Sequence, residues 1–183
     1  MSARLFIAVE IGAEDREALV DWAHSAVGED RGMRVVAAEQ VHLTLVFLGH
    51  RSPQEIDPLD AVVAGFAGRP APPLRTAGAL WLSPRRPHVL TVAVEDVSGG
   101  LAALHRELWD VLEPLGYERE RRRFRPHLTV ARVRHGWTAP TGALAPAPEL
   151  ALAAGSMVLM RSWLGGGPAR YEALSRAALR AGS

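Results

Sequence analysis

Two stretches of the chain share one order of residues: a histidine, an apolar residue, a threonine and a second apolar residue. They are His42-Leu43-Thr44-Leu45 and His127-Leu128-Thr129-Val130. In an extended strand, successive side chains point to opposite faces. Each stretch should therefore present one imidazole and one hydroxyl on a common face, and direct its two apolar residues into a core.

Two such faces on opposite sides of a substrate could catalyse displacement at phosphorus. Neutral and protonated imidazole coexist near physiological pH. One of His42 and His127 could take a proton from the nucleophile while the other gives a proton to the leaving group. In-line displacement needs this arrangement, because the attacking and leaving oxygens lie on opposite sides. Thr44 and Thr129 could bind substrate by donating hydrogen bonds to the non-bridging oxygens.

Other interpretations of the two histidines are less well supported. Both could be ordinary hydrogen-bonded strand histidines, but the pairing with threonine occurs twice. Both could be metal ligands, but neither stretch has a third His, Asp or Glu nearby, so we expect no metal and no cofactor. A serine hydrolase of the usual kind would carry Gly-x-Ser-x-Gly, which the chain lacks.

An internal repeat contains both stretches. When residues 4–50 are compared with 89–135 without a gap, eleven of 47 positions are identical, His42-Leu43-Thr44 and His127-Leu128-Thr129 among them. A self-match of this length suits two half-domains better than a solenoid. Equivalent strands of two such halves would face each other across a groove, and both histidines would line it.

The composition is that of an ordinary globular protein of one domain, spanning 1–183. The chain is 48% hydrophobic and 22% charged, has a net charge of +1 and contains no cysteine. Disulfides and thiolate metal sites are therefore excluded. No apolar run reaches transmembrane length, and Glu10, Glu14 and Asp15 interrupt any signal-peptide pattern. We expect a cytoplasmic monomer that does not bind membranes.

The apolar periodicity predicts alternating strands and helices. Strands are expected at 4–10, 35–36, 41–48, 74–82, 88–95, 126–133, 151–161 and 169–175, and helices at 14–27, from Ser52 and from Ser98. The fold class is therefore α+β, with antiparallel sheets in two similar lobes that are related by approximate two-fold symmetry.

Several finer expectations follow from the same pattern. Ser52 and Glu55 should form a capping box. The helix after Ser98 should bury Leu101, Leu104, Leu108, Val111 and Leu112. Gly165-Gly166-Gly167 should connect the last two strands, and the chain from Arg176 should fray.

The chain resembles the 2H phosphoesterase superfamily, which takes its name from paired His-x-Thr motifs. Within it, the likeness is to the bacterial and archaeal RNA 2′,3′-cyclic phosphodiesterases, also called 2′-5′ RNA ligases. The resemblance covers nearly the whole chain. It rests on Arg4-Leu5-Phe6-Ile7-Ala8, on the first motif through Gly49, on Phe124-Arg125-Pro126 with the second motif through Arg132, on Arg161-Ser162 and on Tyr171-Glu172-Ala173-Leu174.

The resemblance implies that the protein hydrolyses the 2′,3′-cyclic phosphate end of an RNA or nucleotide to a 2′-phosphomonoester without a metal. It implies that His42 gives a proton to the departing 3′ oxygen and that His127 takes one from water. The resemblance leaves open whether a 2′-5′ RNA ligase activity also occurs in the reverse direction. Two alternatives remain: a phosphodiesterase for another cyclic or 2′-5′ nucleotide, and a non-catalytic nucleotide- or RNA-binding module of the same fold.

Arg125, Arg132 and Tyr171 are further candidate substrate-binding residues. Because side chains along a strand alternate between its two faces, Arg125 should lie on the same face as His127. Arg132 should lie on the opposite face unless a bulge intervenes. We therefore favour Arg125 as the phosphate partner. Tyr171 could stack on a base or fill the core.

Overall fold

The computed structural model describes residues 3–82, 85–140, 143–163 and 170–181. The helices are α1 (Ala13–Val27), α2 (Ile56–Ala64) and α3 (Gly100–Leu112), with short 3₁₀ helices η1 (Ala38–Gln40), η2 (Pro53–Glu55) and η3 (Glu113–Leu115). The strands are β1 (Ala3–Ile11), β2 (Met33–Val35), β3 (Leu43–Arg51), β4 (Leu74–Leu82), β5 (Val89–Asp96), β6 (His127–Val133), β7 (Ala151–Leu152), β8 (Ala154–Trp163) and β9 (Arg170–Ala178).

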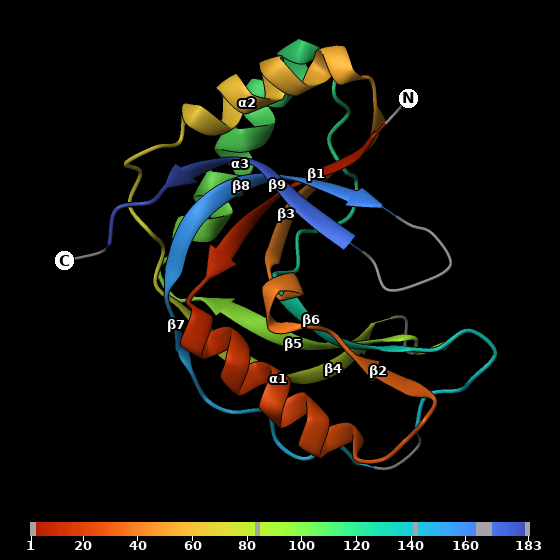
Figure 1. Cartoon of the computed structure of the whole chain (residues 1–183). Helices are drawn as coiled ribbons and strands as arrows, with labels where there is room; N and C mark the ends of the chain where they lie inside the picture. The colour runs from red at the N-terminus through yellow and green to blue at the C-terminus, as the bar shows by residue number, and fades with distance from the viewer. Residues whose placement is uncertain (1–2, 83–84, 141–142, 164–169, 182–183) are drawn as a thin grey trace.

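All the strands of the described residues join one antiparallel sheet, which is strongly curled (Figure 1). Its order is β7-β4-β5-β6-β3-β1-β8-β9, and β2 pairs with β6. The α+β class with antiparallel strands is confirmed, but the strands form one continuous sheet rather than separate sheets. We call the half with β3, β1, β8 and β9 the upper lobe, and the half with β6, β5, β4, β7 and β2 the lower lobe.

The order of elements follows the internal repeat. Apart from one residue at each end, β1, α1 and β3 lie in residues 4–50, and β5, α3 and β6 lie at matching places in 89–135. Within the sheet, β1 lies beside β3 and β5 lies beside β6, so the two copies run outward from a shared junction. The superposition of the two lobes stays a prediction.

The helices cover the outer faces of the curled sheet (Figure 1). α1 contacts β2 and β6 of the lower lobe, and α2 contacts β8 and β9 of the upper lobe. Because α1 directly follows β1, the chain crosses from the upper lobe to the lower lobe at the turn between them. None of the three α-helices lies on the concave face between the lobes, where only the short helix η1 contributes a residue, Gln40.

Alternation along β1 divides its side chains between two environments. Leu5, Ile7 and Val9 are fully buried in the main core beneath the helices. Phe6 and Ala8 point the other way and form a small apolar cluster with residues of β8. This second face of β1 is the floor of the concave side, so a phenylalanine ring reaches the region between the lobes.

The capping box at the start of the second helical segment is confirmed. The Glu55 carboxylate accepts hydrogen bonds from the backbone N–H of Ser52 at 2.8 Å and from its hydroxyl at 3.1 Å. Tyr117 donates to the same carboxylate at 3.1 Å. The hydrogen bond from the Ser52 N–H is the main reason that the pKa of Glu55 lies below its usual range. The bonds from the Ser52 hydroxyl and from Tyr117 lower the pKa further.

Two finer expectations are wrong. Val111 is 44% exposed, and Trp109 is buried on the inner face of α3 instead, because the apolar stripe of a helix drifts relative to a fixed repeat. The chain does not fray at Arg176: β9 continues to Ala178, and Leu179 is buried. The expected connection at Gly165-Gly166-Gly167 lies outside the described residues. No described helix is both long enough and apolar enough to cross a membrane.

Candidate active site

The two His-x-Thr triplets meet where the upper and lower lobes join. β3 and β6 are antiparallel neighbours, and the pair that aligns them is Leu43 with Leu128. Both leucines are fully buried, as the alternation of side chains requires. Their flanking residues therefore point to the opposite, concave face. There they line one cleft of about 450 Å³, with His42 and Thr44 on one side and His127 and Thr129 on the other.

A bulge in β6 decides which arginine joins them. Thr129 pairs with Thr91 of β5, but Ala131 pairs with the adjacent Leu90, so the register skips Val130. An extra residue reverses the alternation beyond it. As a result Arg132 lines the cleft, whereas strict alternation would have turned it away.

The expected placement of the two arginines is therefore reversed. Arg125 is exposed and is not among the residues that line the cleft. Its backbone, however, contacts the second motif directly. The Arg125 carbonyl accepts a hydrogen bond from Nδ1 of His127 at 2.7 Å. A carbonyl can only accept, so the proton of neutral His127 lies on Nδ1 and its Nε2 carries a free lone pair.

His42 lies in an aromatic environment. Phe6 stacks on its ring with centroids 4.9 Å apart and an interplanar angle of 26°. Tyr171 meets the same ring edge-on at 5.2 Å and 89°. Tyr171 is partly buried and lines the cleft, so it supports His42 whether or not it also contacts a base. The two rings fix the orientation of the imidazole before any ligand arrives.

The surroundings of His42 disfavour its charged form. Burial is the main cause, and it lowers the pKa from 6.5 to about 4. The Gln40 carbonyl and Glu10 act in the opposite direction, while Arg132 and His127 lower the pKa further. Nδ1 of His42 is buried without a hydrogen bond of good geometry to any described residue. Without an anion beside it, His42 is therefore neutral at pH 7.

The cleft has further lining residues that the sequence interpretation missed. They are Arg4, Phe6, Arg34, Val36, Gln40, Phe47, Leu82, Val89 and Ser162. Alternation along β1 could have identified Phe6. Arg34 carries no local signal: it reaches the cleft because β2 pairs with β6 and sets Arg34 directly beside Arg132.

Phe47 faces the cleft because of irregular pairing. Two register shifts interrupt the pairing of β3 with β1. As a result Phe47 lines the cleft and is 55% exposed, while Val46 is fully buried.

The cleft is basic. Arg4, Arg34 and Arg132 line it together with the two histidines, and no carboxylate among the described residues does so. Guanidinium groups match phosphate oxygens in bidentate geometry, so the cleft suits a phosphate. Among the described residues, no group of three or more His, Cys, Asp and Glu side chains could hold a metal ion.

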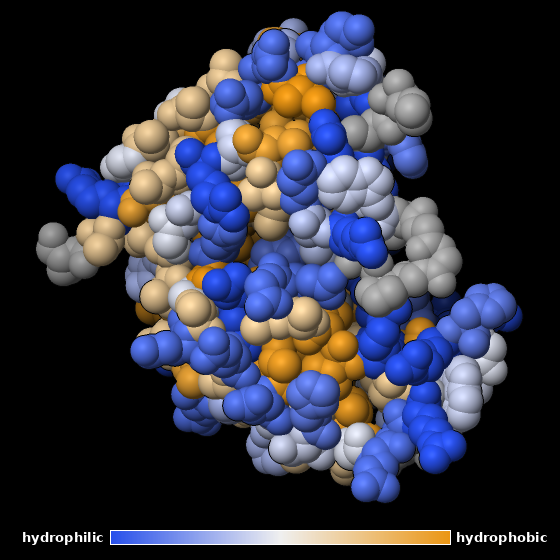
Figure 2. All heavy atoms as spheres, in the orientation of Figure 1, coloured by the Kyte–Doolittle hydropathy of each residue, from blue (hydrophilic) through white to orange (hydrophobic). Residues whose placement is uncertain are grey.

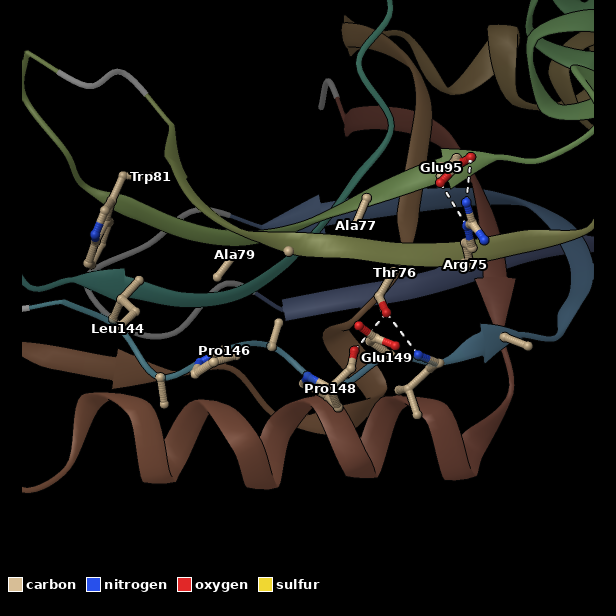
Figure 3. A pocket seen from close by; sticks show the side chains of 15 residues that line it. Arg75, Thr76, Ala77, Ala79, Trp81, Glu95, Leu144, Pro146, Pro148 and Glu149 are labelled. Carbon is tan, nitrogen blue, oxygen red and sulfur yellow. Dashed lines mark hydrogen bonds and ion pairs between the residues drawn. The ribbon is translucent and has the colours of Figure 1, made fainter.

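A larger groove of about 930 Å³ lies on the far side of β4 and contains none of these groups (Figure 3). It separates β4 from residues 144–150, and alanine is the commonest residue in its lining. Thr76 bridges its two walls by donating to the Pro148 carbonyl at 2.7 Å and accepting from the Leu150 N–H at 2.9 Å. Arg75 is paired there with Glu95. Size alone does not mark the site, because no histidine lines this groove and its one arginine is paired with Glu95.

Comparison with known proteins gives a consistent result. The family model described as the 2′-5′ RNA ligase superfamily matches residues 16–162. The chain is 33% identical over 130 residues to an RNA 2′,3′-cyclic phosphodiesterase of Escherichia coli, covering 70% of this chain and 71% of that protein. It is 32% identical over 129 residues to one of Geobacillus stearothermophilus, covering 69% of this chain but only 41% of that relative.

Solved structures share the whole fold. A Thermus thermophilus protein, TT0787, superposes with a TM-score of 0.81 at 30% identity, covering 97% of this chain and 98% of that one. Escherichia coli LigT complexed with 3′-AMP superposes with a TM-score of 0.77 at 26% identity, covering 98% and 99%. The likeness therefore extends over both lobes and the cleft between them.

Proposed function

The chain belongs to the 2′-5′ RNA ligase superfamily, and from that premise we propose that it hydrolyses 2′,3′-cyclic phosphate ends of RNA or nucleotides to 2′-phosphomonoesters. His42 and His127 act as its acid and base. The observation that supports this proposal most is the convergence of both His-x-Thr triplets and Arg132 on one basic cleft. The relatives named RNA 2′,3′-cyclic phosphodiesterase and the 3′-AMP bound to LigT agree with it.

The base in this proposal is His127. Its Nδ1 donates to the Arg125 carbonyl, so Nε2 is the nitrogen that takes a proton from water. The water oxygen then attacks phosphorus as the bond from phosphorus to the 3′ oxygen breaks. The Arg125 carbonyl also stabilises the imidazolium that forms, because the hydrogen bond from Nδ1 strengthens when the ring is charged.

The acid in this proposal is His42, which gives its proton to the departing 3′ oxygen. Its low pKa requires that the substrate itself restores the proton. An anionic phosphate held between His42 and Arg132 raises the pKa of His42, since an opposite charge nearby favours the charged form. The Phe6 ring stacked on His42 also favours the imidazolium through a cation–π contact. Proton transfer to the departing 3′ oxygen is then downhill, because an alkoxide binds a proton far more tightly than imidazole does.

The remaining polar groups bind the phosphate. Thr44 and Thr129 donate hydrogen bonds to its non-bridging oxygens, and Arg132 with its neighbour Arg34 balances their charge. Phe47, exposed on the wall of the cleft, offers an apolar face to the nucleoside. No step requires a metal ion.

The experiment is turnover of 2′,3′-cyclic AMP and of a short RNA with a cyclic phosphate end, in EDTA, with the product identified by phosphorus NMR. A 2′-phosphomonoester formed in EDTA supports the proposal. A 3′-phosphomonoester, or turnover that returns only with a divalent ion, contradicts the mechanism. Binding of the RNA without turnover would favour the non-catalytic alternative. His127→Ala serves as the matched control for contaminating phosphodiesterase.

A further inference from the structure

A second basic groove lies at one end of the lower lobe, outside the cleft. It has a volume of about 700 Å³ and lies between residues 85–88, just before β5, and residues 133–139, at and after the end of β6. We call its polar and aromatic lining the arginine shelf, which consists of Arg85, Arg86, His88, Arg134, His135 and Trp137. In Figure 1 these two segments lie together at the right-hand end of the lower lobe, and Figure 2 shows hydrophilic side chains gathered there.

The charge of the shelf is unbalanced. No carboxylate of the described residues lines the groove. Some arginines elsewhere in the described part of the chain are paired with acids, as Arg75 is with Glu95 and Arg176 is with Glu10. The three shelf arginines form no such pair within the described part of the chain. In a protein of net charge +1, three guanidinium groups without an acidic partner in one groove are a local attraction for polyanions.

Trp137 is held in place and is still 55% exposed. Its ring packs against Gly32, where a Cβ would lie only 2.7 Å from ring atom Cε3. Its backbone N–H donates to the Arg134 carbonyl at 3.0 Å, and the Arg134 N–H donates to the Gly32 carbonyl at 2.7 Å. The ring is therefore a fixed platform beside the arginines. Exposed aromatic rings next to cationic groups are what single-stranded nucleic acids stack on.

The arginine shelf lies just beyond the cleft along β5 and β6, and both strands contribute residues to the cleft. Arg132 in the cleft pairs with Val89. One residue further along both strands, the Val133 N–H donates to the His88 carbonyl at 2.9 Å, where the shelf begins. Arg134 follows Arg132 by two residues, which is about 7 Å in extended chain. A strand that leaves the cleft at this end meets the shelf arginines next.

We propose that the arginine shelf binds the single-stranded RNA that precedes a cyclic phosphate end, with phosphates on Arg85, Arg86 and Arg134 and a base on Trp137. This inference rests on the proposed function. A 2′,3′-cyclic phosphate occupies the 3′ end of a strand, so every nucleotide outside the cleft lies on its 5′ side. A cyclic mononucleotide has one phosphate and one base, both used in the cleft, whereas an oligonucleotide has further phosphates and bases for the shelf. The shelf therefore makes RNA, rather than a free cyclic nucleotide, the preferred substrate.

The test compares kcat/KM for 2′,3′-cyclic AMP with kcat/KM for a short cyclic-phosphate-ended RNA. The triple variant Arg85→Ala, Arg86→Ala, Arg134→Ala should lose activity on the RNA and keep it on the mononucleotide. The triple variant should also depend less on salt. The slope of log(kcat/KM) for the RNA against log[salt] should become shallower by about 0.7 for each RNA phosphate that the shelf no longer binds. Trp137→Ala should reduce kcat/KM for the RNA roughly five- to hundredfold, the usual effect of removing one base-stacking ring.

Matched controls separate the shelf from net charge and from folding. Arg121→Ala, Arg122→Ala, Arg123→Ala removes the same charge from an exposed segment outside the groove. Trp163→Ala removes a similarly exposed ring from the upper lobe. Both should leave the preference for RNA intact, and mononucleotide turnover reports that every variant is folded.

The possible failures are distinguishable. Equal activity of wild type and shelf variants on the RNA, or an equal loss in the control variants, would contradict RNA binding by the shelf. The proposed function would be unaffected by that result. Wild-type protein that turns over neither substrate would overturn the proposed function, and the role of the shelf with it.

Discussion

Leu43 and Leu128, the central residues of the two His-Leu-Thr triplets, are direct partners across the antiparallel junction of β3 and β6. Antiparallel register around this pair sets His42 opposite Thr129 and Thr44 opposite His127. Each histidine therefore has the threonine of the other triplet across from it. A single leucine pair aligns both catalytic candidates, so the geometry of the cleft depends on residues that do not line it.

Removal of either leucine should weaken both stability and turnover. Leu43→Ala and Leu128→Ala should each lower the free energy of unfolding by about 2–5 kcal/mol, because both side chains are fully buried. Facing positions share one cavity, so the double variant should deviate from additivity by about 0.5–3 kcal/mol. Chemical denaturation measures the loss of stability and its non-additivity, and turnover of 2′,3′-cyclic AMP by each folded variant measures the effect on the cleft. Leu59→Ala, a buried change in α2, is the control and should add to Leu128→Ala within about 0.5 kcal/mol.

The two arginines of the second motif should differ sharply. Arg132→Ala should reduce kcat roughly 10²–10³-fold, as expected for loss of a group that balances developing charge. Arg125→Ala should change kcat little, because the contact of Arg125 with His127 uses its backbone carbonyl, which alanine keeps. Steady-state kinetics on a cyclic phosphate compares them. A larger loss in Arg125→Ala would restore the placement that strict alternation predicts.

The low pKa of His42 should appear in stability. The folded protein binds this proton only near pH 4, whereas the unfolded chain binds it near pH 6.5. The free energy of unfolding should therefore decrease as the pH falls from about 6.5 to about 4, by up to about 3 kcal/mol from this group. Above that window the group is neutral in both states and contributes no pH dependence.

Denaturant titrations between about pH 4 and pH 7 test this expectation. His42→Asn should flatten the curve, and His50→Asn, at an exposed position in β3, should not. An unchanged slope in His42→Asn would mean that other groups titrate in this window and that the imidazole is not disfavoured in its charged form.

The two histidines should respond differently to the leaving group. Replacing either one with alanine should reduce turnover roughly 10²–10⁴-fold, and the double variant should lose less than the product of the two effects. A substrate with an activated leaving group needs little protonation, so it should restore much of the activity of His42→Ala and little of that of His127→Ala. Equal rescue of both variants would contradict the division of labour, and rescue of His127→Ala alone would reverse it.

Several features of this protein follow from local sequence. The two triplets, the α+β class and the burial of Leu43 and Leu45 follow because side-chain alternation and apolar periodicity are properties of a few adjacent residues. The capping box at Ser52 and Glu55 is equally local. The proximity of the triplets was predictable from the repeat, since equivalent strands of a duplicated chain pack at a common junction.

Tertiary structure decided the rest. Arg132 rather than Arg125 reached the cleft because a bulge in β6 depends on how that strand pairs with β5, which its own residues do not encode. Arg34 joined it because β2 added to the same strand. Leu179 was buried because the last strand paired with β8. The low pKa of His42 likewise required burial by elements distant in the chain, because desolvation is a property of the assembled surroundings and not of the motif.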